Sequence, residues 1–173
     1  MTPPDRSSHR ERELIGFAER VDLPDWGIRR IRAKVDTGAR SSALHVDGIE
    51  RLPGGKVRFD VVVNRKTGRT KHIVTQLVRV GQVRSSSGKA ETRYFVSTRV
   101  QIGGVIKRIE ISLARRHAML FRMLLGRTAL GHDFLIDPGR RYVTDARPHP
   151  KRKSKTRKGG SRDHERKSEG RST

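Results

Sequence analysis

Residues 31–42 read Ile-Arg-Ala-Lys-Val-Asp-Thr-Gly-Ala-Arg-Ser-Ser, and this stretch decides the fold. Apolar side chains at positions 31, 33 and 35 alternate with basic ones, which is the pattern of a strand with one buried face. The apolar run stops at Asp36, and Thr37 and Gly38 then favour a tight turn. The stretch predicts a strand ending in a carboxylate that the amides of its own turn hold for acid–base chemistry. The same triplet also occurs in ordinary strand-ending turns, so its role depends on the rest of the chain.

The composition is strongly basic. The 173 residues include 40 Lys and Arg against 18 Asp and Glu, a net charge of +22. From Arg147 onward there are 11 basic and three acidic residues, and the remainder is basic as well, with 29 against 15. Such a surface attracts anionic partners, among them nucleic acid, a ribosome or an acidic protein segment.

Several classes of protein are excluded or disfavoured. The absence of cysteine rules out disulfides, thiolate zinc sites and a cysteine nucleophile. No apolar run reaches membrane length, and no secretory signal is visible, so we expect a cytoplasmic protein without a membrane partner.

The apolar periodicity predicts about seven or eight short strands and little helix, hence a mainly β domain forming a small closed or nearly closed barrel. Polar composition predicts a disordered segment over residues 1–11 and a disordered basic tail over 147–173, with the folded domain at 12–146 between them. We expect Thr128 to cap a short helix that extends to about Gly131. The expected strands lie near residues 15–23 (interrupted at Glu19 and Arg20), 28–35, 43–46, 56–63, 72–83, 94–102, 105–113 (after a Gly103-Gly104 hairpin turn), and 134–136 (closed by Asp137-Pro138-Gly139).

Two distant segments carry a resemblance. Asp36-Thr37-Gly38-Ala39 ends an early strand, and Leu124-Leu125-Gly126-Arg127 precedes a short helix late in the chain. The pairing resembles the retropepsin-type aspartic proteases, in which an apolar-apolar-Gly strand packs beside the Asp-Thr-Gly loop and an Arg opens the C-terminal helix. The resemblance implies a small closed retropepsin-like (acid protease) barrel with one short C-terminal helix.

Longer motifs are similar to a bacterial family labelled ATP-dependent zinc proteases, which is associated with RimK-type ATP-grasp glutamate ligases. These motifs are residues 33–45, 83–88, 121–127 and 134–139, and the resemblance covers about residues 12–143. The sequence contains no motif that supports this label. The nucleotide-binding motif Gly-x-x-x-x-Gly-Lys-Ser/Thr and the zinc-binding motif His-Glu-x-x-His are both absent. The histidines His45, His72, His117 and His132 are scattered. We therefore expect no nucleotide, no metal and no other cofactor, and retain the retropepsin fold.

The resemblance implies an aspartic endopeptidase, whose mechanism needs two carboxylates sharing one proton. This chain has one Asp-Thr-Gly, so we expect Asp36 to be catalytic in a homodimer with its symmetry mate. We expect the active-site loop to be supported by Thr37, Gly38, Ala39 and Gly126. We expect Arg127 at the dimer interface, where the alternative is a solvated helix residue.

Arg40 follows the catalytic loop where viral relatives carry acidic residues. With the basic composition, this favours a glutamate-rich substrate such as an oligo-glutamate tail, whereas the alternative is that Arg40 forms a salt bridge within the fold. The expected substrate contacts are Arg40, Ser41, Ser85, Ser86 and Gly88. We expect residues 85–89 to form the flap over the cleft, with the hairpin at 64–69 as the second choice.

Two other functions stay open from the sequence. A non-catalytic module could keep a protease-like barrel and associate with a ribosome or RNA, and the basic tail is the segment expected to make that contact. However, aromatic residues are 5% of the chain and no RNA-stacking motif is visible. A metal-dependent hydrolase is the third alternative, and it predicts loss of activity with a chelator.

Overall fold

The computed structural model describes residues 11–63, 67–84, 88, 90–115 and 120–146. The segments expected to be disordered, 1–11 and 147–173, lie outside the described residues except for Glu11.

The described chain is mainly β, as the sequence predicts, with one short α-helix, α1 (Arg127–Leu130). The three short 3-10 helices are η1 (Pro24–Trp26), η2 (Pro53–Gly55) and η3 (Val143–Ala146). The strands form one 10-stranded sheet, more than the seven or eight expected, because the sequence pattern did not resolve the short strands β4 and β9. They are β1 (Glu13–Leu23), β2 (Ile28–Val35), β3 (Ser42–His45), β4 (Asp47–Leu52), β5 (Lys56–Val62), β6 (Thr70–Arg84), β7 (Ala90–Ile102), β8 (Val105–Ala114), β9 (Met123–Leu125) and β10 (Phe134–Arg141).

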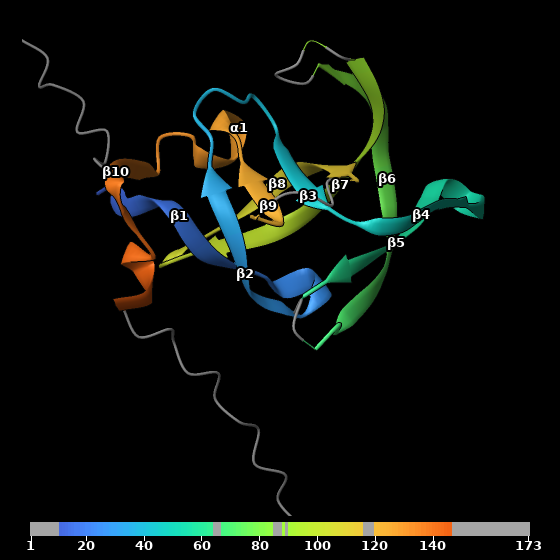
Figure 1. Cartoon of the computed structure of the whole chain (residues 1–173). Coiled ribbons are helices and arrows are strands. Elements are labelled where there is room, and N and C mark those ends of the chain that lie inside the picture. The colour runs from blue at the N-terminus through green and yellow to red at the C-terminus, as the bar shows by residue number, and fades with distance from the viewer. Residues whose placement is uncertain (1–10, 64–66, 85–87, 89, 116–119, 147–173) are drawn as a thin grey trace, which may run out of the picture.

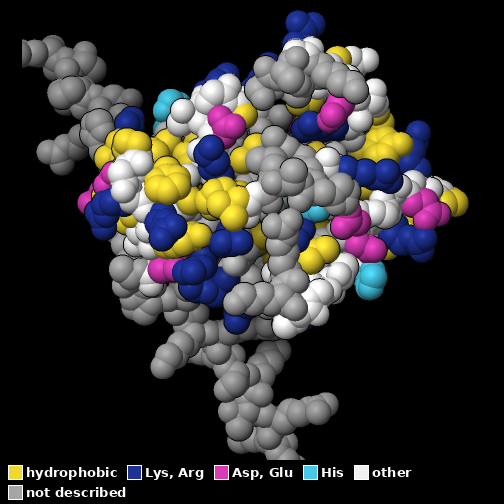
Figure 2. Space-filling model, viewed as in Figure 1, with side chains coloured by type: hydrophobic (Ala, Val, Ile, Leu, Met, Phe, Trp, Pro, Cys, Tyr) yellow, Lys and Arg dark blue, Asp and Glu magenta, His cyan; other side chains and the backbone are white. Residues whose placement is uncertain are grey.

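Six of these strands close into a ring. The sheet order is β10-β1-β2-β9-β3-β8-β7-β6-β5-β4, and β1 also pairs with β7 through Asp22 and Gln101. The ring therefore runs β1-β2-β9-β3-β8-β7, while β6, β5 and β4 extend beyond it (Figure 1). This arrangement confirms the prediction of a small closed barrel. Lys and Arg side chains recur over the face of the molecule seen in Figure 2.

The core fills the ring and extends to buried side chains of β5 and β6, among them Phe59 and Ile73. Ile31, Ala33 and Val35 of β2 are buried, and the basic residues between them are exposed, as the alternation predicts. Trp26 packs edge-on against Phe59 with ring centroids 5.5 Å apart.

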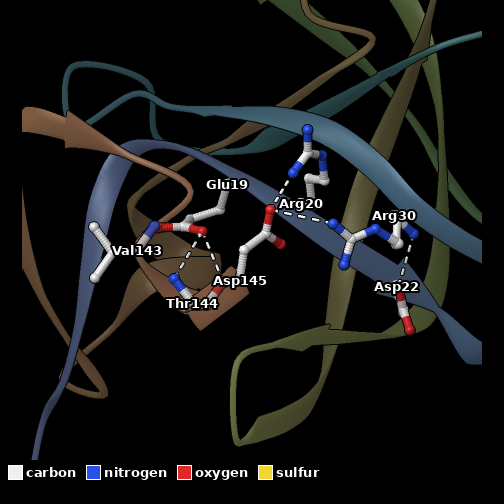
Figure 3. A network of polar contacts seen from close by, with 7 residues as sticks. All are labelled: Glu19, Arg20, Asp22, Arg30, Val143, Thr144 and Asp145. Carbon is white, nitrogen blue, oxygen red and sulfur yellow. Dashed lines mark hydrogen bonds and ion pairs between the residues drawn. The ribbon is translucent and has the colours of Figure 1, made fainter. Parts of the chain in front are cut away.

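β1 is not interrupted at Glu19 and Arg20, so that prediction was wrong. Glu19 is completely buried within the strand. Its carboxylate accepts hydrogen bonds from the backbone N–H of Val143 (2.9 Å) and from the Thr144 N–H (3.3 Å) and hydroxyl (2.7 Å) (Figure 3). It also accepts one from the backbone N–H of Gly16 (2.7 Å). A buried charge is tolerated when such donors satisfy it. These donors come mostly from the far end of the described chain, so periodicity could not reveal them.

Two further expectations need correction. β10 does not stop at Asp137-Pro138-Gly139 but continues to Arg141, because it pairs in parallel with β1. Residues 138–140 bulge opposite Phe17, and a bulge is a position that tolerates proline in a strand. Thr128 does not cap α1, because Gly126 occupies the N-cap position; the Thr128 hydroxyl instead donates to the Arg40 carbonyl (3.0 Å).

Candidate active site

Asp36 lies in the turn that connects β2 to β3, and its side chain is half-buried. Its Oδ1 accepts hydrogen bonds from the backbone N–H groups of Gly38 and Ala39, both at 3.1 Å. Its own N–H donates to the Leu125 carbonyl of β9 at 3.0 Å. The carboxylate is thus held at the end of a rigid strand by its own turn and by the neighbouring strand.

Gly126 lets the chain after β9 pass against this turn. A β-carbon at position 126 would lie 2.6 Å from both the carbonyl carbon and the oxygen of Ser41, and 2.9 Å from the Arg40 carbonyl oxygen. The Gly126 N–H donates to the Ser42 hydroxyl at 3.2 Å. Only a residue without a side chain fits this approach.

Arg127 braces the same turn from within its own chain. Its Nη1 donates to the carbonyls of Thr37 and Gly38, both at 2.9 Å. Its backbone N–H donates to the Ala39 carbonyl at 2.9 Å. The guanidinium therefore fixes the backbone on either side of Gly38, and a contact of Arg127 with a second copy stays a prediction.

A cleft of about 1240 Å³ lies between the Asp36 turn and the hairpin of β6 and β7. The charged side chains among its described lining residues are mostly arginines, which makes the cleft electrostatically positive. These side chains are Arg40, Arg79, Arg84, Arg93 and Arg108 on the basic side, with Asp36 and Glu110 on the acidic side.

The arginines differ in how far they are neutralised. Arg79 Nε lies 3.1 and 3.2 Å from the two carboxylate oxygens of Glu110, and Arg93 pairs with Glu91 at 2.8 Å. In the part of the chain that the structure describes, the exposed side chains of Arg40 and Arg84 make no ion pair. The expected alternative, a salt bridge from Arg40 within the fold, is not found among these residues.

The remaining expected contacts are only partly described. Ser41 lines the cleft and Gly88 is an exposed residue at the tip of the β6–β7 hairpin, but Ser85 and Ser86 lie outside the described residues. Residues 82–84, next to that tip, line the cleft, whereas residues 67–69 of the other hairpin do not. Of the expected flap, residues 85–89, only Gly88 is described, and residues 64–66 of the second choice also lie outside the described residues, so the flap stays a prediction.

The family model described as "RimB-like: Retropepsin-like aspartic endopeptidase RimB" matches residues 14–147. The chain belongs to this RimB-like family. The resemblance to retropepsins is thereby confirmed. The description of the family model does not carry the label of an ATP-dependent zinc protease.

Relatives of this RimB-like chain include larger proteins. One, a "Probable alpha-L-glutamate ligase" of Shewanella pealeana, is 32% identical over 137 residues, which are 75% of this chain and 29% of that protein. A protein of the same description from Desulfotalea psychrophila is 34% identical over 135 residues, 73% of this chain and 28% of that protein. The chain thus spans less than a third of the length of these relatives, whose names agree with the expected association with glutamate ligases.

A solved structure shares the fold of this RimB-like chain. A Legionella pneumophila protein of unknown function aligns with a TM-score of 0.65 and 25% identity, covering 78% of this chain and 99% of that one. This likeness supports the barrel architecture.

Sequence reasoning missed one wall of the RimB-like cleft. The Arg79 guanidinium lies 3.5 Å above the centre of the Phe95 ring while it binds Glu110. A β-carbon on Gly81 would lie 2.6 Å from Arg79 Nη1 and 3.3 Å from Phe95 Cε2. A glycine inside a strand signals such a close approach, but its partners cannot be read from the local sequence.

The described residues of this RimB-like chain hold no group of three or more His, Cys, Asp or Glu side chains that could bind a metal ion. His72 Nδ1 instead lies 2.6 Å from Asp60, His45 is buried beside Asp47, and His117 lies outside the described residues. Among the described helices, none is long and apolar enough to span a bilayer.

Proposed function

We propose that this RimB-like protein is an aspartic endopeptidase whose dyad is Asp36 of one copy and Asp36 of a second copy. The observation that carries the proposal is the braced Asp36 carboxylate at the edge of a large cleft. The described lining includes one other carboxylate, Glu110, and Arg79 holds it. A second copy is the source of the second acid that the chemistry requires.

The reaction needs no group beyond the dyad and water. Two close carboxylates share one proton, because both cannot ionise cheaply. The ionised carboxylate takes a proton from water as the water oxygen attacks the peptide carbonyl carbon, and the other carboxylic acid donates to the carbonyl oxygen. The tetrahedral diol then collapses, the C–N bond breaks, and the amine nitrogen receives a proton from the dyad. The turn around Asp36 supplies the fixed geometry.

We further propose that the substrate is a glutamate-rich segment. Arg40 and Arg84 lie on the two sides of the cleft, and both guanidinium groups are exposed without an ion pair among the described residues. Carboxylates are natural partners for such groups. The names of the relatives describe glutamate ligation, and a peptidase acting on oligo-glutamate would remove what such a ligase adds.

The test is cleavage of a peptide with an oligo-glutamate tail, measured with chelator present. Wild type should cleave it, and should cleave an oligo-glutamine analogue poorly. Asp36→Asn should lower kcat roughly 100- to 10,000-fold, which is the range for removal of an acid–base group. Loss of wild-type activity in chelator would instead indicate a metal-dependent hydrolase. Absence of cleavage by wild type under all conditions would favour a binding module.

A mixing experiment tests the shared dyad. When wild type and Asp36→Asn chains are allowed to exchange in equal amounts, random pairing leaves about one quarter of the dimers with two wild-type chains. If mixed dimers are inactive, activity should therefore fall to about one quarter of that of pure wild type at the same total chain concentration. A fall to about one half would mean that each chain acts alone, and would overturn the dimeric site.

A further inference from the structure

A row of cross-strand partners runs along the cleft from the strand beside the Asp36 turn to β6. Each member pairs with the next one on the neighbouring strand, and all of them line the cleft. Neighbouring strands are about 4.8 Å apart, so the row covers about 19 Å along the sheet. In order through β9, β3, β8, β7 and β6, its members are Leu124, Ala43, Ser112, Phe95 and Arg79.

A β-bulge places Arg79 at the end of this row. Leu77 of β6 pairs with Val96 of β7. The preceding residue of β7, Phe95, pairs with Arg79, so Val78 is an extra residue in β6. Regular alternation would have put Val78 opposite Phe95. Bulges are common next to active sites, where they re-aim a side chain, and this one brings an arginine to the cleft in place of a valine.

The Arg79 guanidinium is held in a fixed orientation. Its flat face lies 3.5 Å above the centre of the Phe95 ring, and its Nε lies 3.1 and 3.2 Å from the two carboxylate oxygens of Glu110. Gly81 leaves the space that this position requires, since a β-carbon there would lie 2.6 Å from Arg79 Nη1. A stacked arginine with an oriented fork is suited to bind a carboxylate.

Glu110 is the carboxylate that occupies the fork in this structure, and it is held weakly. The side chains of Arg79 and Glu110 are 47% and 36% exposed. Among the described residues, Glu110 makes no hydrogen bond or ion pair except with Arg79. The buried carboxylate of Glu19, by contrast, has backbone and hydroxyl donors around it. An exposed ion pair contributes little to stability, so Glu110 can leave Arg79 at small cost.

We propose that Arg79 is a carboxylate-binding subsite of the cleft, which Glu110 occupies in the free protein and a glutamate side chain of the substrate takes over on binding. The proposal rests on the glutamate-rich substrate proposed above. A substrate carboxylate keeps the guanidinium paired when Glu110 leaves, whereas a glutamine amide cannot replace the lost charge. Glu110 thus selects against neutral peptides.

The length of the row limits where the contacted glutamate lies in the substrate. An extended peptide advances about 3.3 Å per residue, so a path of about 19 Å corresponds to about six residues. The glutamate at Arg79 is therefore within about six residues of the bond that the Asp36 dyad cleaves.

The test is a double-mutant cycle on the full chain, with the Kd of a fluorescent hexaglutamate peptide measured by anisotropy. All chains carry Asp36→Asn, so that the peptide stays intact. Glu110→Gln should lower the Kd severalfold, because Arg79 is then free of its internal partner. In chains that also carry Arg79→Gln, Glu110→Gln should have little effect. The control is Glu50→Gln, which neutralises an exposed acid paired with Arg58 outside the cleft lining and should change the Kd less than half as much.

Gly81→Ala tests the subsite without changing any charge. Gly81 does not have a positive φ, so alanine is tolerated by the backbone, but its β-carbon would push the Arg79 guanidinium off the Phe95 ring. We expect the Kd of hexaglutamate to rise severalfold. Gly139→Ala, whose β-carbon would make its nearest contact at an ordinary 3.4 Å, is the control and should leave the Kd unchanged.

Three results would overturn the proposal. A higher Kd in Glu110→Gln would mean that Glu110 orients Arg79 for the substrate, and an unchanged Kd would mean that Glu110 does not compete with the substrate. An equal gain with and without Arg79→Gln would mean that only the net charge of the cleft matters. Cleavage is measured separately in chains that retain Asp36. Absence of cleavage would overturn the peptidase proposal and leave the binding result intact, so the two failures are distinguishable.

Discussion

Gly126 approaches Ser41 so closely that a β-carbon on it would stand 2.6 Å from the Ser41 carbonyl. The same junction ties β9 to the turn that carries Asp36, since the Leu125 carbonyl at the end of β9 accepts a hydrogen bond from the Asp36 N–H. The position of the carboxylate is thus set by a residue that has no functional group of its own.

Gly126→Ala should therefore displace the turn and reduce cleavage strongly. Because the neighbouring atoms are backbone, overpacking should also lower the free energy of unfolding by about 1–3 kcal/mol. Urea denaturation and kcat/KM would measure the two effects. Gly139→Ala is the control, because its new β-carbon would meet its nearest neighbour, Asp137 Oδ1, at an ordinary 3.4 Å. Unchanged activity in Gly126→Ala would contradict this role.

Arg127→Lys should impair catalysis more than stability. Nη1 of the exposed Arg127 donates to the carbonyls of both Thr37 and Gly38, and the rotating ammonium group of lysine lacks the fixed planar N–H directions of a guanidinium. We expect kcat to fall about tenfold or more, because small misplacement of a reacting group is costly, with a near-normal melting temperature. Arg29→Lys, an exposed residue on β2, is the matched control. Sedimentation of both variants would also test the predicted interface role, since replacing an arginine at the dimer interface would shift the monomer–dimer equilibrium.

Arg84→Gln should raise KM for a glutamate-rich peptide severalfold and leave an uncharged peptide almost unaffected. The reason is that Arg84 lines the cleft with an unneutralised charge, so its contribution depends on the substrate's carboxylates. The effect should shrink as salt is added. Arg51→Gln removes an exposed charge on β4 and serves as the comparison. Equal KM changes for both peptides would indicate a structural role for Arg84.

Asp25 should give the fold an acid-sensitive contact. The Arg99 backbone N–H at 2.9 Å and the Arg99 guanidinium at 2.6 Å lower the pKa of the Asp25 carboxyl from its ordinary 3.8. A depressed pKa in the folded state contributes stability above the unfolded-state value and loses it as pH falls through the folded value. Asp25→Asn should thus destabilise the protein at pH 7, and the difference from wild type should vanish on acidification below about 3.8. A difference independent of pH would contradict this.

Thr144→Val should destabilise the fold through Glu19. The variant keeps the shape of the side chain but removes the hydroxyl that donates to the buried carboxylate at 2.7 Å. Loss of a partner from a buried charged group costs about 1–3 kcal/mol. Chemical denaturation measures this cost, and Thr92→Val, at an exposed position on β7, should have little effect. A neutral Thr144→Val would mean that water replaces the hydroxyl.

The sequence was most informative where the determinants are local. Alternation of apolar and basic residues predicts the strand β2 at residues 28–35, as observed. The pair Gly103-Gly104 predicts the turn between β7 and β8, which is also observed. The Asp36 turn was also readable, because its acceptor and its donors lie within three residues of each other. Burial on alternate positions and the torsional freedom of glycine are sufficient to specify such features.

Features that depend on distant partners could not be read in this way. Glu19 resembles a break in a strand until Thr144, 125 positions away, is placed beside it. Arg79 and Glu110 are 31 positions apart, and nothing near either residue announces the pair. The approach of Gly126 to the Asp36 turn was anticipated only through the resemblance to a family, since spacing alone does not bring the two segments together.

The partners of Glu19 also have a consequence for how this protein is made. A growing chain can form β1 early, but the carboxylate in its middle acquires the Val143 and Thr144 donors only after those residues have left the ribosome. Until then a charged group would have to be buried without its donors, which is costly. The contacts of Glu19 can therefore be completed only after almost the whole described domain has been translated.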